Sequence, residues 1–121
     1  MKKFTIIFVS IILSSMALAN LKGVEFIEPK PGAKYINLET TIIIKPEAKF
    51  MNLINPATFN IEVSGTKSGY HTGKIILSDD GTTIIFKPDK FFSLGEKVTV
   101  NFKIPTQQKS IYEFYTKEKY C

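Results

Sequence analysis

The segment Gly73–Pro88, which reads GKIILSDDGTTIIFKP, carries the strongest structural signal in this chain. Two runs rich in β-branched residues, Gly73–Ser78 and Thr82–Lys87, flank the short polar stretch Asp79–Gly81. Asp-Gly between two such runs is typical of a β-hairpin, because these residues tolerate the backbone conformations that a tight turn requires. The segment therefore predicts two antiparallel strands joined by a turn.

Runs of the same kind precede and follow this hairpin, each bounded by Pro, Gly, Asn or Asp. They are Gly23–Ile27, Thr40–Lys45, Phe59–Val63, Lys97–Ile104 and Ile111–Thr116. In Phe59–Val63 apolar and polar residues alternate, as in a strand with one buried face. With the hairpin, these runs make about seven short strands at a spacing of about 8–12 residues, which predicts an all-β fold, an antiparallel β-sandwich. No long helical crossover separates them, which excludes a parallel sheet.

Two local expectations accompany this fold. We expect Val24 and Phe26 of the first strand to pair with Ile36, beyond the first turn. Only Phe50–Ala57 has helical character, and Pro56 limits it to one or two turns, because the residue before a proline is disfavoured in the helical conformation.

The first residues have the pattern of a targeting segment. Lys2 and Lys3 come first, residues 4–13 are apolar apart from a Thr and a Ser, and Ala17-Leu18-Ala19 ends the segment. This order is typical of a secretory signal peptide. The apolar run is shorter than the ~20 residues that span a membrane, and no Cys follows Ala19 to carry a lipid. We expect a signal peptide over residues 1–19, a domain over 20–121 without a stable membrane anchor, and a secreted, periplasmic or cell-surface location.

Turn residues and strand ends follow one another in a recognisable order. They are Pro29–Ala33 with Asn37 and Thr40, Asn55–Phe59, Asp79–Pro88, Phe92 with Gly95 and Val100, and Phe114–Thr116. Together they resemble the bacterial Ig-like domain found in surface-layer and other secreted multidomain proteins, over roughly Gly23–Lys117. Asp79–Pro88 is the best match. The resemblance implies an Ig-like β-sandwich without a disulfide between its sheets.

Two positions depart from the family pattern. Val98 stands where the family often has Tyr, so a corner anchored by a hydroxyl cannot form there. Pro46 stands where an aromatic residue commonly ends the second strand, which favours an edge or a bulge. Without a disulfide the core must be apolar, and we expect it to contain Phe26, Ile42, Ile44, Phe59, Ile61, Val63, Ile75, Leu77, Ile84, Phe86, Val98, Val100, Phe102 and Phe114.

Residues suited to catalysis are scarce. The single histidine, His71, lies in the stretch Ser-Gly-Tyr-His-Thr-Gly, which indicates a loop or a strand edge. It cannot be placed against any particular Ser, so we expect a surface or loop imidazole. The single cysteine, Cys121, is the terminal residue, where nothing holds a base beside it. One His and one Cys far apart match no zinc spacing, and no glycine-rich phosphate motif occurs. We therefore expect no enzymatic activity, no catalytic or metal-binding residues and no cofactor.

Four carboxylates, those of Asp79, Asp80, Asp89 and Glu96, could supply oxygen ligands to Ca²⁺. Their number and spacing match no calcium-binding loop. Asp is also favoured in hairpin turns, where it accepts hydrogen bonds from nearby backbone groups. We therefore favour turn capping for Asp79 and Asp80 over a calcium site.

Aromatic residues gather near the C-terminus, namely Tyr112, Phe114, Tyr115 and Tyr120. Alternation places every second one in the core, so Tyr115 and Tyr120 could form a contact surface for a protein or glycan partner. All 16 basic residues are Lys, and they are scattered among Glu and Asp. Lys is a poor replacement for Arg in phosphate and base recognition, so nucleic acid is not an expected partner.

Three functions remain compatible with these residues. The favoured one is a non-catalytic secreted Ig-like module that acts as a spacer or interaction domain. The second is the N-terminal accessory domain of a truncated or split secreted enzyme, because similar Ig-like segments follow the signal peptide in some bacterial arylsulfate sulfotransferases. The third is a self-assembling surface subunit, joined by strand addition at an open sheet edge.

Overall fold

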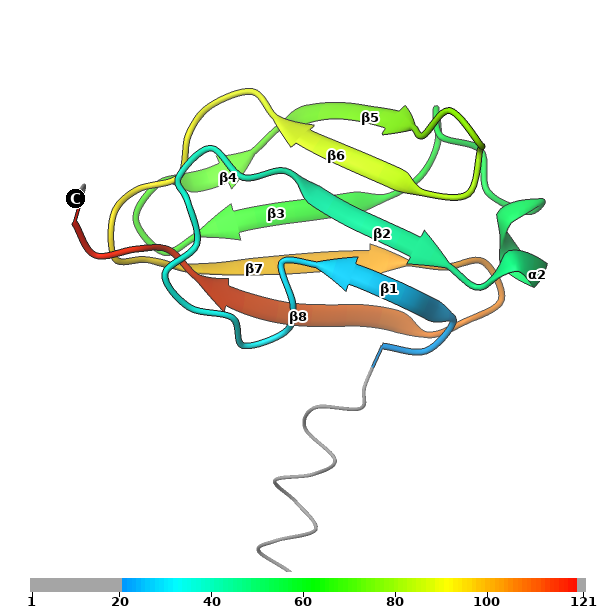
Figure 1. Ribbon diagram of the computed structural model, residues 1–121, viewed down its shortest axis with the longest axis horizontal. Helices are drawn as coiled ribbons and strands as arrows, with labels where there is room; N and C mark the ends of the chain where they lie inside the picture. The colour runs from blue at the N-terminus through cyan, green and yellow to red at the C-terminus, as the bar shows by residue number, and fades with distance from the viewer. Residues whose placement is uncertain (1–20, 120–121) are drawn as a thin grey trace, which may run out of the picture.

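Two four-stranded sheets face each other in the computed structural model of the protein, which describes residues 21–119 (Figure 1). The first sheet has the order β1-β2-β6-β5, with β1 (Val24–Glu28), β2 (Ile42–Pro46), β6 (Ile84–Pro88) and β5 (Gly73–Leu77). The second has the order β4-β3-β7-β8, with β4 (Gly69–His71), β3 (Ile61–Gly65), β7 (Lys97–Lys103) and β8 (Lys109–Tyr115). Paired strands are antiparallel throughout. A short helix, α2 (Ala48–Met51), follows β2.

The predicted antiparallel β-sandwich is confirmed, but the described residues form eight strands and not seven. In constant-type immunoglobulin domains, strands A, B, E and D form one sheet and strands C, F and G the other. In this protein the first sheet has the same order, with β1, β2, β6 and β5 in the positions of A, B, E and D. In the second sheet, β3, β7 and β8 take the positions of C, F and G. The additional strand is β4, which pairs with β3 and has only three residues. A strand this short has no alternation from which it could be predicted.

The predicted hairpin is formed by β5 and β6, which pair along their whole lengths. In its turn, Asp80 Oδ1 accepts hydrogen bonds from the Ser78 hydroxyl at 2.7 Å, the Thr82 hydroxyl at 2.8 Å and the Thr82 N–H at 3.1 Å. These hydrogen bonds favour the ionised carboxylate and lower the pKa of Asp80 to about 2. The predicted capping of this turn is thus confirmed for Asp80.

The apolar core lies between the two sheets. Of the predicted core residues, the structure buries Ile42, Ile44, Phe59, Ile61, Val63, Ile84, Phe86, Val98, Val100, Phe102 and Phe114, with Ile75 partly buried against them. The prediction is wrong for Phe26 and Leu77, which are 45% and 37% exposed. A register shift between Val24 and Phe26, close to Pro46, turns Phe26 outward, and Ile27 takes the inner position. The bulge that Pro46 favours therefore lies not in β2, which contains Pro46, but in β1, which pairs with it. Leu77 ends the edge strand β5.

The predicted pairing of Val24 and Phe26 with Ile36 is wrong, because β1 pairs with β2 instead. Ile36 forms a parallel bridge with Thr116. Backbone hydrogen bonds join residues 32–36 to β8 and to the residues that follow it. The segment after β1 therefore covers the free edge of β8 and does not fold back on β1.

The helical segment is shorter and earlier than predicted, since α2 spans Ala48–Met51 and not Phe50–Ala57. Asn55 begins a turn, in which its side-chain Oδ1 accepts a hydrogen bond from the Ala57 N–H and its carbonyl accepts one from the Thr58 N–H, both at 3.0 Å. An Asn side chain that bonds the backbone two residues later stabilises a turn and competes with helix. This turn leads the chain into β3.

The chain enters and leaves the sandwich on opposite sides (Figure 1). β1 starts on the side of α2, where Gly23 lies against Phe50, and β8 ends on the side where Lys117 accepts a hydrogen bond from the Gly95 N–H. The predicted signal peptide, Tyr120 and Cys121 lie outside the described residues. Within residues 21–119, no helix has the length and apolarity to cross a membrane.

Candidate functional site

A buried polar cluster lies where β3 turns into β4 and where β7 begins. Ser68 lies in the β3–β4 turn, His71 lies in β4, and Glu96 is the residue just before β7. Glu96 and His71 are only 2% and 1% exposed, although ionisable side chains are rarely buried unless they are paired. We call Ser68, His71 and Glu96 the Glu96 cluster.

The Glu96 carboxylate accepts four hydrogen bonds. Oε1 accepts from the backbone N–H of Lys67 at 2.7 Å and of Ser68 at 2.9 Å. Oε2 accepts from the Ser93 N–H at 2.6 Å and from the Ser68 hydroxyl at 2.7 Å. Burial opposes ionisation, but the hydrogen bonds from Ser93, Ser68 and Lys67 outweigh it and lower the pKa of Glu96. An ionised carboxylate thus ties the β3–β4 turn to the loop before β7.

Two neighbouring residues accommodate and orient Glu96. Gly65, the last residue of β3, has no side chain, and a Cβ there would fall on the Glu96 carboxylate and the Ser68 hydroxyl. Thr116 Oγ1 accepts a hydrogen bond from the Glu96 N–H at 2.9 Å and donates one to the Ser93 carbonyl at 2.7 Å. The cluster therefore also holds the residue after β8.

The hydrogen bonds determine which groups of the cluster carry protons. A carboxylate only accepts, so Ser68 donates its one hydroxyl proton to Glu96. Ser68 Oγ then accepts from His71 Nε2, which is 2.7 Å away. The neutral ring has its proton on Nε2, and Nδ1 is left buried without a hydrogen-bond partner. In nucleophilic catalysis the imidazole takes the serine proton instead, whereas here the Ser68 proton is directed to the Glu96 carboxylate.

For His71 the predicted strand edge is confirmed, but the prediction of a surface or loop imidazole is wrong. The residue lies in the edge strand β4, but its ring packs on Phe92 with centroids 4.4 Å apart, and Phe92 packs edge-on against Phe114 at 5.8 Å. The sequence lacks a signal for this cluster, because Ser68 and Glu96 are 28 residues apart and belong to different loops. The one local indication is Gly65, a glycine inside a strand, which often marks a close approach.

Titration of His71 couples the cluster to the pH dependence of stability. Burial and the Lys90 ammonium lower the pKa of His71 below its ordinary value of 6.5, against the opposing effects of the Glu96 carboxylate and of the Lys90 backbone. As the pH falls below 6.5, the unfolded chain therefore binds a proton that the folded chain does not, and the free energy of unfolding decreases. We expect the urea midpoint to fall between about pH 7.5 and about pH 5.5, and to fall less in His71→Gln.

In this pH range the effect of His71 protonation on stability can be distinguished from that of Glu96 protonation. The ordinary pKa of Glu is 4.5 and the pKa of Glu96 is lower still, so Glu96 stays ionised throughout. Tyr70→Gln, at the exposed neighbouring position in β4, is the control that leaves His71 in place. If the urea midpoint fell equally with pH in His71→Gln and in Tyr70→Gln, the assignment of this pH dependence to His71 would be contradicted.

The four carboxylates considered for Ca²⁺ are not brought together. Asp80 caps the hairpin turn, Asp89 accepts a hydrogen bond from the Thr72 hydroxyl at 2.9 Å, and Glu96 is enclosed by hydrogen-bond donors. Among residues 21–119, no group of three or more His, Cys, Asp and Glu side chains could hold a metal ion.

The C-terminal aromatic residues divide between the core and the surface as alternation predicts. Tyr112 is buried, its hydroxyl has no hydrogen-bond partner, and burial raises its pKa. Tyr115 faces outward and lines a depression of about 360 Å³ together with Lys34, Tyr35, Thr116 and Glu118. Tyr35 is well exposed and was not predicted, because it reaches Tyr115 only when residues 32–36 cover β8. Tyr120 lies outside the described residues.

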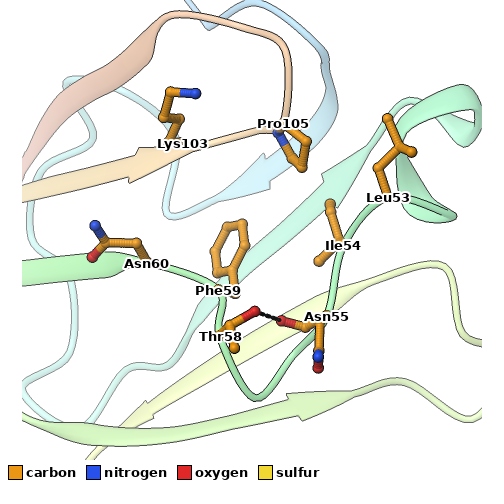
Figure 2. A pocket seen from close by; sticks show the side chains of 8 residues that line it. All are labelled: Leu53, Ile54, Asn55, Thr58, Phe59, Asn60, Lys103 and Pro105. Carbon is orange, nitrogen blue, oxygen red and sulfur yellow. Dashed lines mark hydrogen bonds between the residues drawn. The ribbon is translucent and has the colours of Figure 1, made fainter.

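A second depression lies between the turn before β3 and the end of β7 (Figure 2). Its volume is about 200 Å³, and its lining is Leu53, Ile54, Asn55, Thr58, Phe59, Asn60, Lys103 and Pro105. Figure 2 shows the Thr58 hydroxyl close to Asn55, whose carbonyl accepts its hydrogen bond at 3.3 Å. The lining is half apolar and half polar, and Lys103 is its one ionisable residue, so this depression lacks an acid–base pair among the described residues.

No protein-family model and no curated protein matches the sequence. Among solved structures, the fold is similar to L,D-transpeptidase 3 from Mycobacterium tuberculosis, with a TM-score of 0.53 and 19% identity over 78% of this chain. It is also similar to LD transpeptidase LdtMt1 in complex with imipenem, with a TM-score of 0.51 and 14% identity over 80% of this chain. This chain spans only 37% and 40% of those two chains.

A third similar structure is PcoC, a copper resistance protein from Escherichia coli. Its TM-score is 0.51 and its identity 14%, over 78% of this chain and 98% of PcoC. The protein is thus a small β-sandwich domain similar to domains of these bacterial proteins. At such identities the likeness shows the fold alone, and the resemblance to sulfotransferase accessory domains has no support from a sequence family.

Proposed function

We propose that the protein is a non-catalytic β-sandwich module that acts as a structural spacer or interaction domain outside the cytoplasm. The observation that carries this proposal is the Glu96 cluster. The single histidine of the chain does lie beside a serine, yet Ser68 donates its proton to Glu96 and His71 is enclosed. The cluster's polar groups are used to hold loops, which leaves Ser68 without a base. The signal-like pattern of residues 1–19 supports export.

The course of the chain supports a spacer. It enters at the start of β1 and leaves at the end of β8, on opposite sides of the sandwich (Figure 1). β7 and β8 have seven residues each, and a strand of that length spans about 23 Å. Segments attached at the two ends would therefore be held apart by a rigid body.

The exposed rings of Tyr35 and Tyr115 support an interaction role. Both line the same depression, beside Lys34 and Glu118. A Tyr side chain offers a large apolar area and a polar hydroxyl, which suits contacts with a protein or a glycan. We place the interaction surface of the module there.

A fluorophosphonate probe tests the absence of catalysis, since it forms a covalent adduct with activated serines. We expect no adduct at Ser68 under conditions that fully label a serine hydrolase in parallel, because the hydroxyl proton goes to Glu96. Intact mass and peptide mapping measure the adduct. An adduct at Ser68 in the wild type that disappears in His71→Gln would contradict the proposal.

The second candidate is an accessory domain of a larger secreted enzyme. The L,D-transpeptidase matches favour it, because a sandwich of this kind forms 37% and 40% of those enzyme chains. In this case catalysis would belong to a segment beyond residues 21–119. A catalytic domain encoded in frame after Cys121 would support this candidate, and a stop codon directly after Cys121 would oppose it.

A further inference from the structure

The outer edge of β5 carries backbone groups without partners. β5 has β6 as its neighbour on one side and no strand on the other. The backbone groups of Thr72 and Ser78 bond toward β6. Since the groups of alternate residues in an antiparallel strand point to the same side, those of Gly73, Ile75 and Leu77 point away from β6. No hydrogen bond within the described residues reaches them.

The other three sheet edges of the described structure are shielded. Residues 32–36 cover β8. β1 contains the bulge and the charged residues Glu25 and Glu28, and Pro29, which lacks an N–H, follows it. β4 has only three residues. Bulges, charges, proline and short length are the features that block strand addition, so β5 is the open edge.

An apolar row crosses the outer face of the first sheet and ends at this edge. Ile43 lies opposite Ile85, and Ile85 lies opposite Ile76 of β5. Ile43 and Ile85 are half-buried, whereas Ile76 is largely exposed. On the inner face, Ile75 packs against the core and Leu77 is only partly covered. Both faces of β5 thus present apolar side chains that a further strand would bury.

We propose that this strand is β5 of a second copy of the chain, added antiparallel in the register that sets Ile76 opposite Ile76. In this register, Ile75 and Leu77 of one copy face Leu77 and Ile75 of the other and exchange their free backbone hydrogen bonds. The isoleucine row then runs through both copies in one continuous sheet. The pairing goes beyond the proposed function and does not depend on it.

Charges are complementary in this register. Lys74 of β5 lies opposite Lys87 of β6, and neither has an ion-pair partner among the described residues. Like charges directly opposite each other are unfavourable. In the dimer, Lys74 lies opposite Ser78 of the second copy, next to Asp79 and Asp80 of that turn. Each Lys74 therefore gains acidic neighbours that it lacks in one copy.

Disulfide cross-linking tests the register directly. In a Cys121→Ser background, Ile76→Cys places two thiols at a non-hydrogen-bonded pair, where the Cα atoms are about 4.5 Å apart, within disulfide range. Lys74→Cys places the two thiols four residues apart along the strands, about 13 Å, which is too far. We expect the covalent dimer of Ile76→Cys to form at least 10-fold faster than that of Lys74→Cys.

Ile111→Cys is the matched control for collisions, because Ile111 lies in β8 of the other sheet and is 53% exposed, against 45% for Ile76. Equal oxidation rates for Ile76→Cys and Ile111→Cys would overturn the proposal. A mixture of Ile76→Cys and Lys74→Cys that cross-links faster than Ile76→Cys alone would overturn the register.

The molar mass of the chain without cysteine substitutions provides an independent measurement. Light scattering coupled to size exclusion is expected to give twice the chain mass at high concentration for the wild type and for Ile111→Lys, and a single chain mass for Ile76→Lys. Circular dichroism checks that both variants are folded. A wild type that stays monomeric at every concentration, or a folded Ile76→Lys variant that stays dimeric, would overturn the proposal.

Discussion

Replacement of Glu96 by Gln is expected to lower the free energy of unfolding by about 2–4 kcal/mol, because two partly buried donors lose their acceptor. Gln has nearly the same shape as Glu, so the change leaves no cavity. Its amide group, placed at Oε2, would face the Ser93 N–H and the Ser68 hydroxyl, which are both donors. A fully buried donor left without a partner costs about 1–3 kcal/mol, and because these two donors are only partly buried we expect about 1–2 kcal/mol from each. Urea unfolding at neutral pH measures the difference.

Glu113→Gln is the matched control, since the Glu113 carboxylate is half-exposed and 3.5 Å from the Lys97 ammonium. Exposed ion pairs contribute about 0.2–1 kcal/mol, so we expect a change of less than about 1 kcal/mol. Hydrogen exchange adds a local measurement, because the amide of Ser93, which loses its acceptor at Oε2, should exchange faster in Glu96→Gln alone. Similar stability losses in both variants would contradict the role assigned to Glu96.

Phe114→Ala is expected to lower the free energy of unfolding by about 3–5 kcal/mol, the usual range for removing a buried Phe side chain. Phe114 is fully buried in β8, its ring packs edge-on against Phe92, and it lies 6.4 Å from the ring of Tyr112. Phe92 in turn contacts His71. The substitution therefore leaves a cavity between the core and the Glu96 cluster, and chemical denaturation measures the loss.

Phe91→Ala provides the comparison, because Phe91 precedes Phe92 in the chain but is 64% exposed. Exposed substitutions away from special features usually change stability by less than about 0.5 kcal/mol. If Phe91→Ala lowered the free energy of unfolding as much as Phe114→Ala does, burial of the Phe114 ring would not be the cause of the loss. Both variants should retain the circular dichroism of a β protein if they fold.

Local patterns were sufficient for most of the strands and for the layout of the fold. The β5–β6 hairpin followed from its Asp-Gly turn, and the structure adds that Asp80 caps it. In β7 every second residue is buried, as the alternation indicates. These features depend on residues close in sequence, whose pattern reflects one buried and one exposed face.

Where a residue's environment depended on distant segments, the sequence was a poor guide. Phe26 has the apolar character of a core residue, but the bulge in β1 reverses its direction, and a shift of one residue exchanges the two faces of a strand. Residues 32–36 pair with β8, which lies far along the chain. Neither outcome is encoded in the neighbouring residues.

The sequence by itself determined the class of fold, because alternating apolar residues between turn residues can bury their apolar face only by stacking two sheets. Tertiary structure alone decided the chemistry of the polar residues. Ser68, His71 and Glu96 look unrelated along the chain, yet they meet in the interior, where hydrogen bonding keeps Glu96 ionised and assigns the proton of Ser68. The open edge of β5 has the same origin, since strand order, and not strand composition, decides which backbone groups remain unpaired.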